Sequence, residues 1–220
     1  MQFIDNKWYY FNENGLMQIG LQTIDNSGYY FNKDGVLQTG WQSINGEKYY
    51  FSENGKATPG YKTIDGKKYL FANNGLEIQN IIPNSQMKII SYSTEQNKKE
   101  YSANNIIDGK LNDNWQNIWN RSDKNPYVTI ELDHPYNLNE LVCFPRQDGG
   151  WNGDIEEYKI LVSIDGKNFK EAASGKWIYS TSNESQYANL NGVKAKYIKI
   201  ESKKGIYDLA TIAEAILSGT

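Results

Sequence analysis

The stretch WQSINGEKYYFSENGKATPG, residues 41–60, places two turn signals, Asn45-Gly46 and Asn54-Gly55, around the aromatic run Tyr49-Tyr50-Phe51. Asn-Gly supplies the positive backbone angles of tight turns, so the stretch predicts a short β-hairpin followed by a connection. Because side chains alternate across a strand, the first and third rings of the run share one face and the middle ring takes the other.

The same pattern recurs every 20 residues through the first 80 residues. The other rows are MQFIDNKWYYFNENGLMQIG (1–20), LQTIDNSGYYFNKDGVLQTG (21–40) and YKTIDGKKYLFANNGLEIQN (61–80). A single two-stranded hairpin is not stable alone. We therefore expect the rows to stack as a β-hairpin solenoid, with one aromatic face buried as a spine and the other left as a row of rings.

These rows resemble the cell-wall-binding repeats of Gram-positive surface proteins, which include choline-binding, glucan-binding and clostridial toxin repeats. Choline-binding members cage a quaternary ammonium with tryptophans. Of the matching positions here, only Trp8 and Trp41 are tryptophan, and the others are Met1, Leu21, Gly28, Lys48, Tyr61 and Lys68. The resemblance therefore implies the saccharide-binding subgroups rather than choline. The alternative, that the aromatic side chains only hold the array together, stays open.

Composition limits the other classes of function. The net charge is only −3 and charged residues make up 22%, so no nucleic acid or anionic membrane is expected as partner. The single cysteine, Cys143, excludes an intramolecular disulfide. There is no apolar run long enough to insert into a membrane. Because Met1 falls inside a repeat, we expect the chain to be part of a longer secreted or cell-surface protein.

The 20-residue period stops at Ile81, and Ile82-Pro83-Asn84-Ser85 predicts a boundary between a domain at 1–80 and a domain at 81–220. Beyond it, short strand-like runs recur without helical periodicity, at 127–132, 140–144, 158–163, 196–201 and 211–218. Short strands with intervening loops predict an antiparallel β-sandwich. The predicted fold class is therefore all-β.

No catalytic group stands out in this second domain. His134 is the only histidine and precedes Pro135 in a predicted turn, and Cys143 lies in an apolar run typical of a core. Glu156 and Glu157 are adjacent in a strand-like run, so they point to opposite faces and cannot flank one glycosidic bond. We expect a non-catalytic accessory region of a larger secreted enzyme or toxin.

Four stretches of the second domain carry a more specific resemblance. They are SANNIIDGKLNDNW (102–115), PRQDGGWNG (145–153), YKILVSIDGKNFKEAASGKW (158–177) and ATIAEAILSG (210–219). In this order they resemble the discoidin-type (coagulation factor C-type) jelly roll, and most closely the family 32 carbohydrate-binding modules of secreted clostridial glycosidases. The resemblance implies a discoidin-like β-sandwich that binds glycans.

The loop at 145–153 offers the groups that a sugar requires. Arg146 has a planar fork for two hydroxyl oxygens, and Asn152 adds a donor and an acceptor. By resemblance, the carbohydrate-binding residues are Arg146, Asn152, Tyr207, Trp151 and Gln116. Gln116 stands where many galactose-type relatives have histidine, so terminal galactose and N-acetylhexosamine both remain candidate ligands. Alternatively, Arg146 is a structural partner of Asp148 or Asp154.

Segment 105–114 is rich in the oxygen ligands that calcium prefers. The resemblance implies a structural Ca²⁺ that joins N- and C-terminal parts of the sandwich. Its ligands would be the carboxylates and carbonyls of Asn105, Asp108, Lys110, Asp113, Ala213 and Glu214. Asp113 stands where the family usually has threonine. The alternative is an Asx-turn loop without metal.

Together these features predict a glycan-binding region that targets a secreted Gram-positive, clostridial-type glycosidase or toxin to host mucin-type or cell-surface saccharides. A second hypothesis is a cell-wall anchor. In that case the repeats bind teichoic acid or glucan, and the sandwich contacts a host protein.

Overall fold

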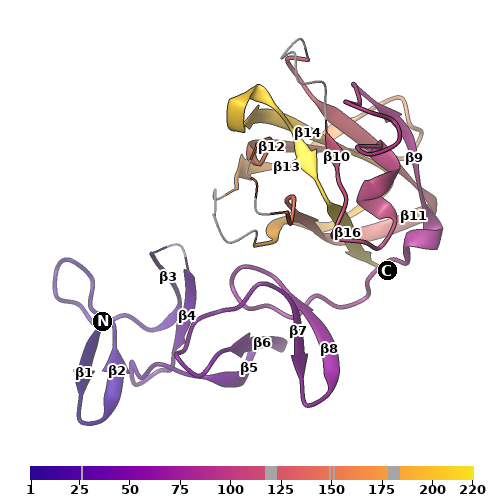
Figure 1. Ribbon diagram of the computed structural model, residues 1–220. Coiled ribbons are helices and arrows are strands. Elements are labelled where there is room, and N and C mark those ends of the chain that lie inside the picture. The colour runs from indigo at the N-terminus through magenta and orange to yellow at the C-terminus, as the bar shows by residue number, and fades with distance from the viewer. Residues whose placement is uncertain (26, 117–122, 149, 151, 178–183) are drawn as a thin grey trace. The chain divides into compact units, whose positions relative to one another are not determined.

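The computed structural model describes residues 1–25, 27–116, 123–148, 150, 152–177 and 184–220, which form two compact units, Met1–Gln79 and Asn80–Thr220 (Figure 1). Their regular structure is nearly all β, with three short 3₁₀ helices, η1 (Asn84–Gln86), η2 (Ala103–Ile107) and η3 (Ile206–Asp208). Among these residues there is no helix with the length and hydropathy of a membrane span.

The first unit consists of four antiparallel hairpins, each a separate two-stranded sheet. They are β1 (Gln2–Ile4) with β2 (Lys7–Tyr9), β3 (Gly20–Ile24) with β4 (Ser27–Phe31), β5 (Gly40–Ile44) with β6 (Glu47–Phe51), and β7 (Gly60–Ile64) with β8 (Lys67–Phe71). The predicted turns are confirmed, because Asn45 and Gly46 both have positive φ (53° and 87°), as a type I′ turn requires. The equivalent turn at Asp25-Asn26 includes Asn26, which lies outside the described residues.

The aromatic runs join consecutive hairpins. Tyr49 and Phe51 are buried and their rings stack with centroids 6.5 Å apart, which confirms that the first and third rings share a face. The predicted free row of middle rings is wrong. Each middle ring instead lies against the phenylalanine of the following row, at centroid distances of 6.2, 6.2 and 5.7 Å for Tyr10–Phe31, Tyr30–Phe51 and Tyr50–Phe71. The packing buries apolar area that a single hairpin leaves exposed.

One backbone hydrogen bond repeats with the period of the sequence. The amide of residue 17 of a row donates to the carbonyl of residue 8 of the preceding row, over 2.9, 2.8 and 2.8 Å, in the pairs Leu37–Trp8, Ala57–Gly28 and Glu77–Lys48. These two positions are therefore neighbours at every junction between rows.

The second unit is built on a six-stranded antiparallel sheet with the order β13-β12-β14-β11-β16, in which β9 also pairs with β11. A separate ladder joins β10 to β15. The strands are β9 (Met87–Tyr92), β10 (Trp115–Gln116), β11 (Tyr127–Phe144), β12 (Ile155–Ser163), β13 (Lys170–Lys176), β14 (Gln186–Gly205), β15 (Thr211–Ile212) and β16 (Glu214–Gly219). The predicted strand runs lie in β11, β12, β14 and β15–β16, which confirms them.

The predicted turn at His134-Pro135 is wrong, because both residues lie inside β11. The pairing of β11 with β14 shifts register between Glu131 and Tyr136. Proline has no amide hydrogen to donate to a ladder, and a bulge is where a strand tolerates it. The sequence signal was therefore a local irregularity rather than the end of a strand.

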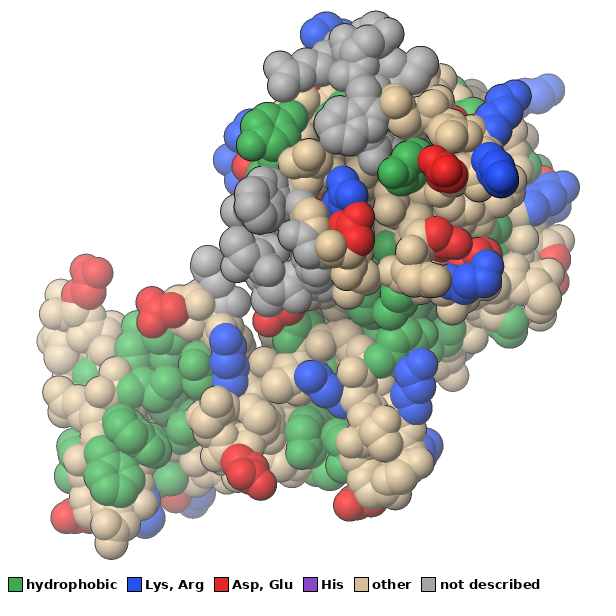
Figure 2. Space-filling model, viewed as in Figure 1, with side chains coloured by type: hydrophobic (Ala, Val, Ile, Leu, Met, Phe, Trp, Pro, Cys, Tyr) green, Lys and Arg blue, Asp and Glu red, His purple; other side chains and the backbone are tan. Residues whose placement is uncertain are grey.

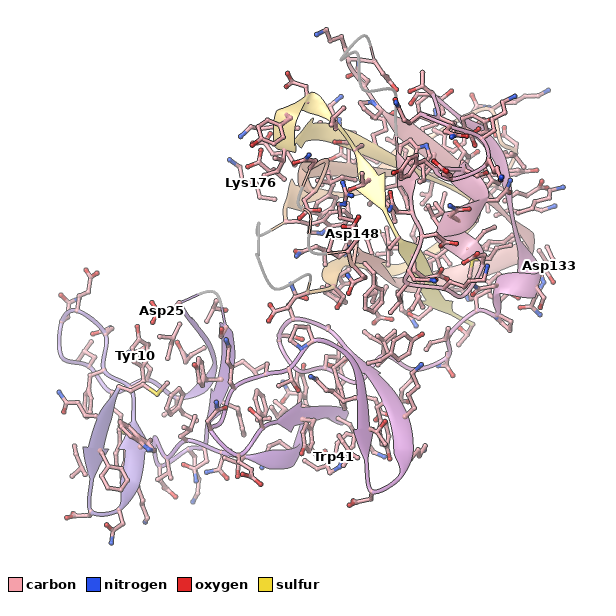
Figure 3. The ribbon with its side chains drawn as sticks, viewed as in Figure 1. Tyr10, Asp25, Trp41, Asp133, Asp148 and Lys176 are labelled. Atoms are coloured by element: carbon pink, nitrogen blue, oxygen red, sulfur yellow. The ribbon has the colours of Figure 1, made fainter. Side chains whose placement is uncertain are left out.

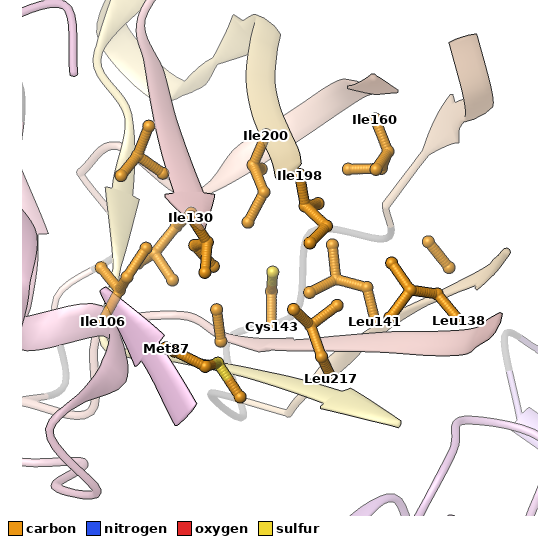
Figure 4. Close-up of a cluster of buried hydrophobic side chains, with 14 of the residues drawn as sticks. Met87, Ile106, Ile130, Leu138, Leu141, Cys143, Ile160, Ile198, Ile200 and Leu217 are labelled. Carbon is orange, nitrogen blue, oxygen red and sulfur yellow. The ribbon is translucent and has the colours of Figure 1, made fainter. Parts of the chain in front are cut away.

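The core of the second unit is formed by aliphatic side chains from several strands and from η2 (Figure 4). Ile130, Ile198 and Leu217 are each at most 1% exposed. Cys143 is also buried, as predicted, and burial raises the pKa of its thiol. A protonated thiol in an apolar core is not a nucleophile.

Candidate functional site

Backbone hydrogen bonds join the loop 145–154 to the segment that contains η3 and β15. The bonds are Gly153 N to Ile206 O (3.2 Å), Ile206 N to Asp154 O (3.0 Å) and Thr211 N to Gly153 O (2.7 Å). Thr211 also pairs with Gln116 in the β10–β15 ladder. Three segments that are distant in the sequence, bearing Arg146, Tyr207 and Gln116, therefore meet at one place.

Gly153 is required for this junction. Its φ is +90°, and a Cβ at this position would lie 2.7 Å from the Thr211 side chain. Only glycine combines the left-handed conformation with so close an approach. Gly153 thus allows the loop to contact β15 closely.

Arg146 is held mainly by Asp148, whose position Figure 3 shows. The guanidinium donates from Nε to Asp148 Oδ1 at 2.8 Å and from Nη2 to Oδ2 at 2.5 Å, and the longer contact from Nη1 reaches the Asn152 carbonyl oxygen at 3.5 Å. These bonds raise the pKa of Arg146 and lower that of Asp148. Of the five N–H groups of a guanidinium, two have no partner among the described residues. The structural pairing of Arg146 with Asp148, one of the two alternatives for this residue, is therefore present.

The predicted pair of Arg146 and Asn152 is adjacent, but the contact uses the Asn152 backbone. The Asn152 side chain is half-buried. Trp151 lies outside the described residues, and Gln116 is described only in its backbone.

Tyr207 is the exposed aromatic residue of η3. Its side chain is 53% exposed and its φ is +60°, followed by +58° at Asp208. A bulky residue in the left-handed region is an outlier that costs on the order of 1–2 kcal/mol. Strained residues of this kind are frequent in ligand-contacting segments, and the Tyr207 ring is open to solvent.

Asp154 is a buried carboxylate that the sequence did not single out. It is 7% exposed and its Oδ1 has no hydrogen-bond partner among the described residues. Burial raises its pKa to about 7, although the Arg146 charge opposes the rise. A cavity of about 20 Å³ is lined by Asp154 and Thr211, whose Oγ1 is likewise unpaired in this part of the chain. The raised pKa places the protonation change of Asp154 near neutral pH.

The predicted calcium residues converge from two ends of the second unit. Glu214 is 3% exposed and accepts hydrogen bonds from Asn84 Nδ2 (2.8 Å) and from the Gly109 amide (3.1 Å). Burial raises its pKa to about 7, and the charges of Asp108 and Asp113 add to the rise. Burial also raises the pKa of Asp113, again with Asp108 contributing. Of these three carboxylates only Glu214 is buried, and their mutual repulsion favours a cation between them.

The donor chemistry of this segment fits calcium in part. Asp113 Oδ1 is buried and has no hydrogen-bond partner among the described residues, so one hard oxygen is uncommitted. In contrast, the Lys110 ammonium lies 2.7 Å from Asp108 Oδ2 and 4.0 Å from Asp113 Oδ2. No group of three or more His, Cys, Asp or Glu side chains within the described ranges has metal-binding spacing. The carboxylates are neighbours, but their side chains alone are not a preassembled cage. The Asn105 amide hydrogen-bonds the carbonyls of Glu100 and Asn114.

Comparisons with known proteins agree with this architecture. The model of the F5/8 type C domain matches residues 89–215, that of a choline-binding repeat matches 18–57, and that of a putative cell wall binding repeat matches 2–17 and 60–76. Galactose oxidase of Gibberella zeae is 33% identical over 102 residues, which are 44% of this chain and 15% of that protein. The chain thus spans only a small part of this relative.

Two solved structures from Clostridium perfringens are similar to the second unit. One is a family 32 carbohydrate-binding module in complex with GalNAc-β-1,3-galactose, with 30% identity, a TM-score of 0.58, and coverage of 63% of this chain and 99% of that one. The other is the family 32 module of NanJ in complex with galactose, with 28% identity, a TM-score of 0.56, and coverage of 63% and 97%. The discoidin-like β-sandwich is confirmed, and with more than half of its 220 residues matched, the chain belongs to the F5/8 type C domain family.

Proposed function

We propose that the second unit binds terminal galactose- or N-acetylhexosamine-type glycans without altering them. The observation that carries this proposal is the oriented Arg146 guanidinium, two of whose N–H groups have no partner among the described residues, on a loop hydrogen-bonded to the segment that bears the exposed Tyr207. A charge-assisted fork bonds adjacent hydroxyls, and an aromatic face covers the C–H side of a sugar. The two solved relatives named above hold ligands of this kind.

The role follows from this binding. We infer an accessory module that keeps a larger secreted, clostridial-type glycosidase or toxin on glycan surfaces, including mucin-type and cell-surface saccharides. One site contributes little affinity, since a neutral hydrogen bond is worth about 0.5–1.5 kcal/mol net and a charged one about 1.5–3. Several weak sites on one chain increase retention on a polyvalent surface.

A glycan array with the whole chain and with Arg146→Ala tests the proposal. We expect galactose- and N-acetylgalactosamine-terminated glycans to retain the wild type, and the variant to lose that signal. Equal signals from the two proteins would contradict the role of Arg146, and an array without any retained glycan would contradict sugar binding.

A second candidate function rests on the first unit. The matches to choline-binding and cell wall binding repeats favour anchoring to a cell-wall polymer such as teichoic acid or glucan. A pull-down on purified Gram-positive walls separates the two functions. Retention on walls that free galactose does not compete would assign the anchoring to the hairpin unit.

We also propose a structural Ca²⁺ at the segment of Asp108, Asp113 and Glu214. The mutually repelling carboxylates, of which Glu214 is buried, and the Asp113 oxygen that has no partner among the described residues support it. These three side chains would hold the ion, with the carbonyls of Asn105, Lys110 and Ala213 as further donors. Bound calcium would neutralise the charge of these carboxylates.

A further inference from the structure

Two grooves of similar size lie at junctions between rows of the hairpin unit. Each is named by its junction: the first groove lies at the junction of rows 1–20 and 21–40, and the third groove at the junction of rows 41–60 and 61–80. The first groove has a volume of about 430 Å³ and its walls include Met1, Trp8 and Leu37. The third groove has a volume of about 450 Å³ and is lined by Trp41, Gln42, Ser43, Lys48, Lys67, Tyr69 and Glu77. Both are within the size range of small-molecule sites. Neither groove contains a residue of the sugar site proposed for the second unit.

The repeating backbone hydrogen bond makes the two grooves equivalent in position. It joins Leu37 to Trp8 in the first groove and Glu77 to Lys48 in the third. The intermediate junction, between Gly28 and Ala57, is closely packed, since a Cβ on Gly28 would lie 3.2 Å from the Ala57 Cβ. The two residues joined by this hydrogen bond are therefore apolar at the first junction, small at the second and charged at the third.

The wall of the first groove is apolar where the repeat positions meet. Trp8 is 46% exposed and Met1 is also 46% exposed. Hydrophobic side chains reach the surface of the hairpin unit in Figure 2. Lys7 and Glu53 also line this groove, one charge of each sign, so its wall has no net charge to attract a sugar acid.

The third groove has a rigid aromatic wall. Trp41 is 38% exposed, and three rings hold its indole at centroid distances of 5.3, 5.0 and 5.6 Å, from Tyr50, Tyr69 and Phe71 (Figure 3). The ring–ring angles of 65°, 67° and 54° are those of edge and tilted contacts. Such contacts fix the plane of the indole, and its exposed part remains open to the C–H face of a ligand.

The charges of the third groove are mostly positive. Lys48 and Lys67 are exposed, and the Lys67 ammonium lies 4.9 Å from the centroid of the Tyr69 ring, which itself lines the groove. Glu77 is half-buried and accepts a hydrogen bond from Gln79 at 3.1 Å. Two ammonium groups against one carboxylate leave a net positive wall around the indole.

We propose that the third groove binds an acidic saccharide, with a sugar ring against Trp41 and its carboxylate between Lys48 and Lys67. Gln42, Ser43 and Glu77 provide hydrogen-bond partners for hydroxyls. A quaternary ammonium ligand is excluded, because it would enter a site where Lys48 and Lys67 already carry like charge. The groove thus includes repeat positions that hold choline in the related repeats, but its lysines favour an anion instead of a cation.

The experiment titrates glucuronate, glucose and choline into the whole chain and follows the Trp41 indole N–H by NMR. It uses an Arg146→Ala background, so that the sandwich site does not contribute. Glucuronate has a carboxylate where glucose has a hydroxymethyl group, so the comparison isolates the effect of the negative charge. We expect glucuronate to bind at least threefold more tightly than glucose and choline to leave the Trp41 signal unchanged. Lys48→Gln and Lys67→Gln should each reduce the preference for glucuronate and leave glucose binding as it was.

Lys68→Gln is the matched control, because its ammonium lies 3.8 Å from the Tyr61 ring centre, and neither residue lines the groove. It should retain the preference for glucuronate. The proposal is overturned by equal affinities for glucuronate and glucose, by a shift of Trp41 with choline, by an equal loss in the control, or by no response of Trp41 to glucuronate.

Discussion

Arg146 has its orientation before any ligand arrives, because Asp148 takes two of its N–H groups and the Asn152 carbonyl contacts a third. The Arg146 side chain is only 13% exposed, whereas that of Asp148 is 54% exposed. A preorganised guanidinium loses little conformational freedom when it binds, which is how a weak contact becomes selective. In the proposed sugar site, Asp148 is therefore a positioning residue for Arg146.

Asp148→Asn tests this role. The amide cannot hold the fork with two acceptors, so we expect the affinity for N-acetylgalactosamine to fall about three- to tenfold, measured by calorimetric titration. The melting temperature should change little, since an ion pair with a partner as exposed as Asp148 is worth about 0–1 kcal/mol. Asp133→Asn, which alters an exposed pair with His134, is the control and should bind like the wild type. Unchanged affinity in Asp148→Asn would show that Arg146 does not need this partner.

The buried carboxylate of Asp154 predicts a pH dependence of stability. Its pKa is raised from 3.8 to about 7, so the folded state binds a proton that the unfolded state has already released. The free energy of unfolding should therefore fall as pH rises from about 4 to about 7 and should then level off. Asp154→Asn should remove this part of the slope in urea titrations at several pH values. A slope unchanged in the variant would assign the effect to other groups.

At this scale, the sequence predicted that Arg146 and Asn152 lie together better than it predicted which of their atoms are in contact. The loop spacing identified Arg146 and Asn152, but the contact is made by the Asn152 carbonyl, because backbone dihedrals decide which atom a loop presents. The burial of Asp154 depends on its place against β15, a tertiary contact with no local sequence signal. The carbohydrate role of Tyr207 and the other residues stays a prediction.

The hairpins follow from their turns. Two-residue Asn-Gly and Asp-Gly turns with positive φ fix the register of each pair, so the local sequence predicts each hairpin. The placement of the middle ring was not predictable from alternation within one strand, because its partner belongs to the following row. The irregularity at Pro135 likewise depends on pairing with β14.

Two glycines at the same position of their rows provide a matched test of row packing. Gly15 and Gly75 have φ of +74° and +90°, but a Cβ on Gly15 meets nothing within 4 Å, whereas one on Gly75 would lie 2.8 Å from the Tyr50 carbonyl oxygen. Gly15→Ala should cost about 1–2 kcal/mol of backbone strain. Gly75→Ala should cost a further 1–3 kcal/mol, roughly, from overpacking against a backbone that cannot move aside. Calorimetry of the whole chain measures the difference, and equal costs would contradict the packing of the fourth row.

For the whole molecule, the change of period at Ile81 predicted two domains of different construction, and the compact units are Met1–Gln79 and Asn80–Thr220. The sequence predicted hairpin repeats for the first unit and a β-sandwich for the second, because periodicity and turn residues are local features. The sequence did not predict how the segments that bear Arg146, Tyr207 and Gln116 come together, because this depends on pairings such as Gln116 with Thr211.

Calcium should act on the second unit as a whole, since its proposed ligands come from both ends of that unit. We expect 1 mM Ca²⁺ to raise the melting temperature of the sandwich and a chelator to reverse the rise. At a concentration 100-fold above the dissociation constant, the gain is about 2.7 kcal/mol. Asp113→Asn should abolish the response and Asp133→Asn should retain it. A melting temperature independent of calcium would favour the Asx-turn loop without metal.

In the proposed function, an oriented guanidinium binds a saccharide. Calorimetric titration of N-acetylgalactosamine into the wild type and Arg146→Lys, at constant calcium concentration, tests it most directly, since lysine keeps the charge and loses the planar fork. We predict a dissociation constant on the order of 0.1–1 mM for the wild type and at least tenfold weaker binding for the variant. The same dissociation constant in both proteins, or no heat of binding in the wild type, would contradict the account.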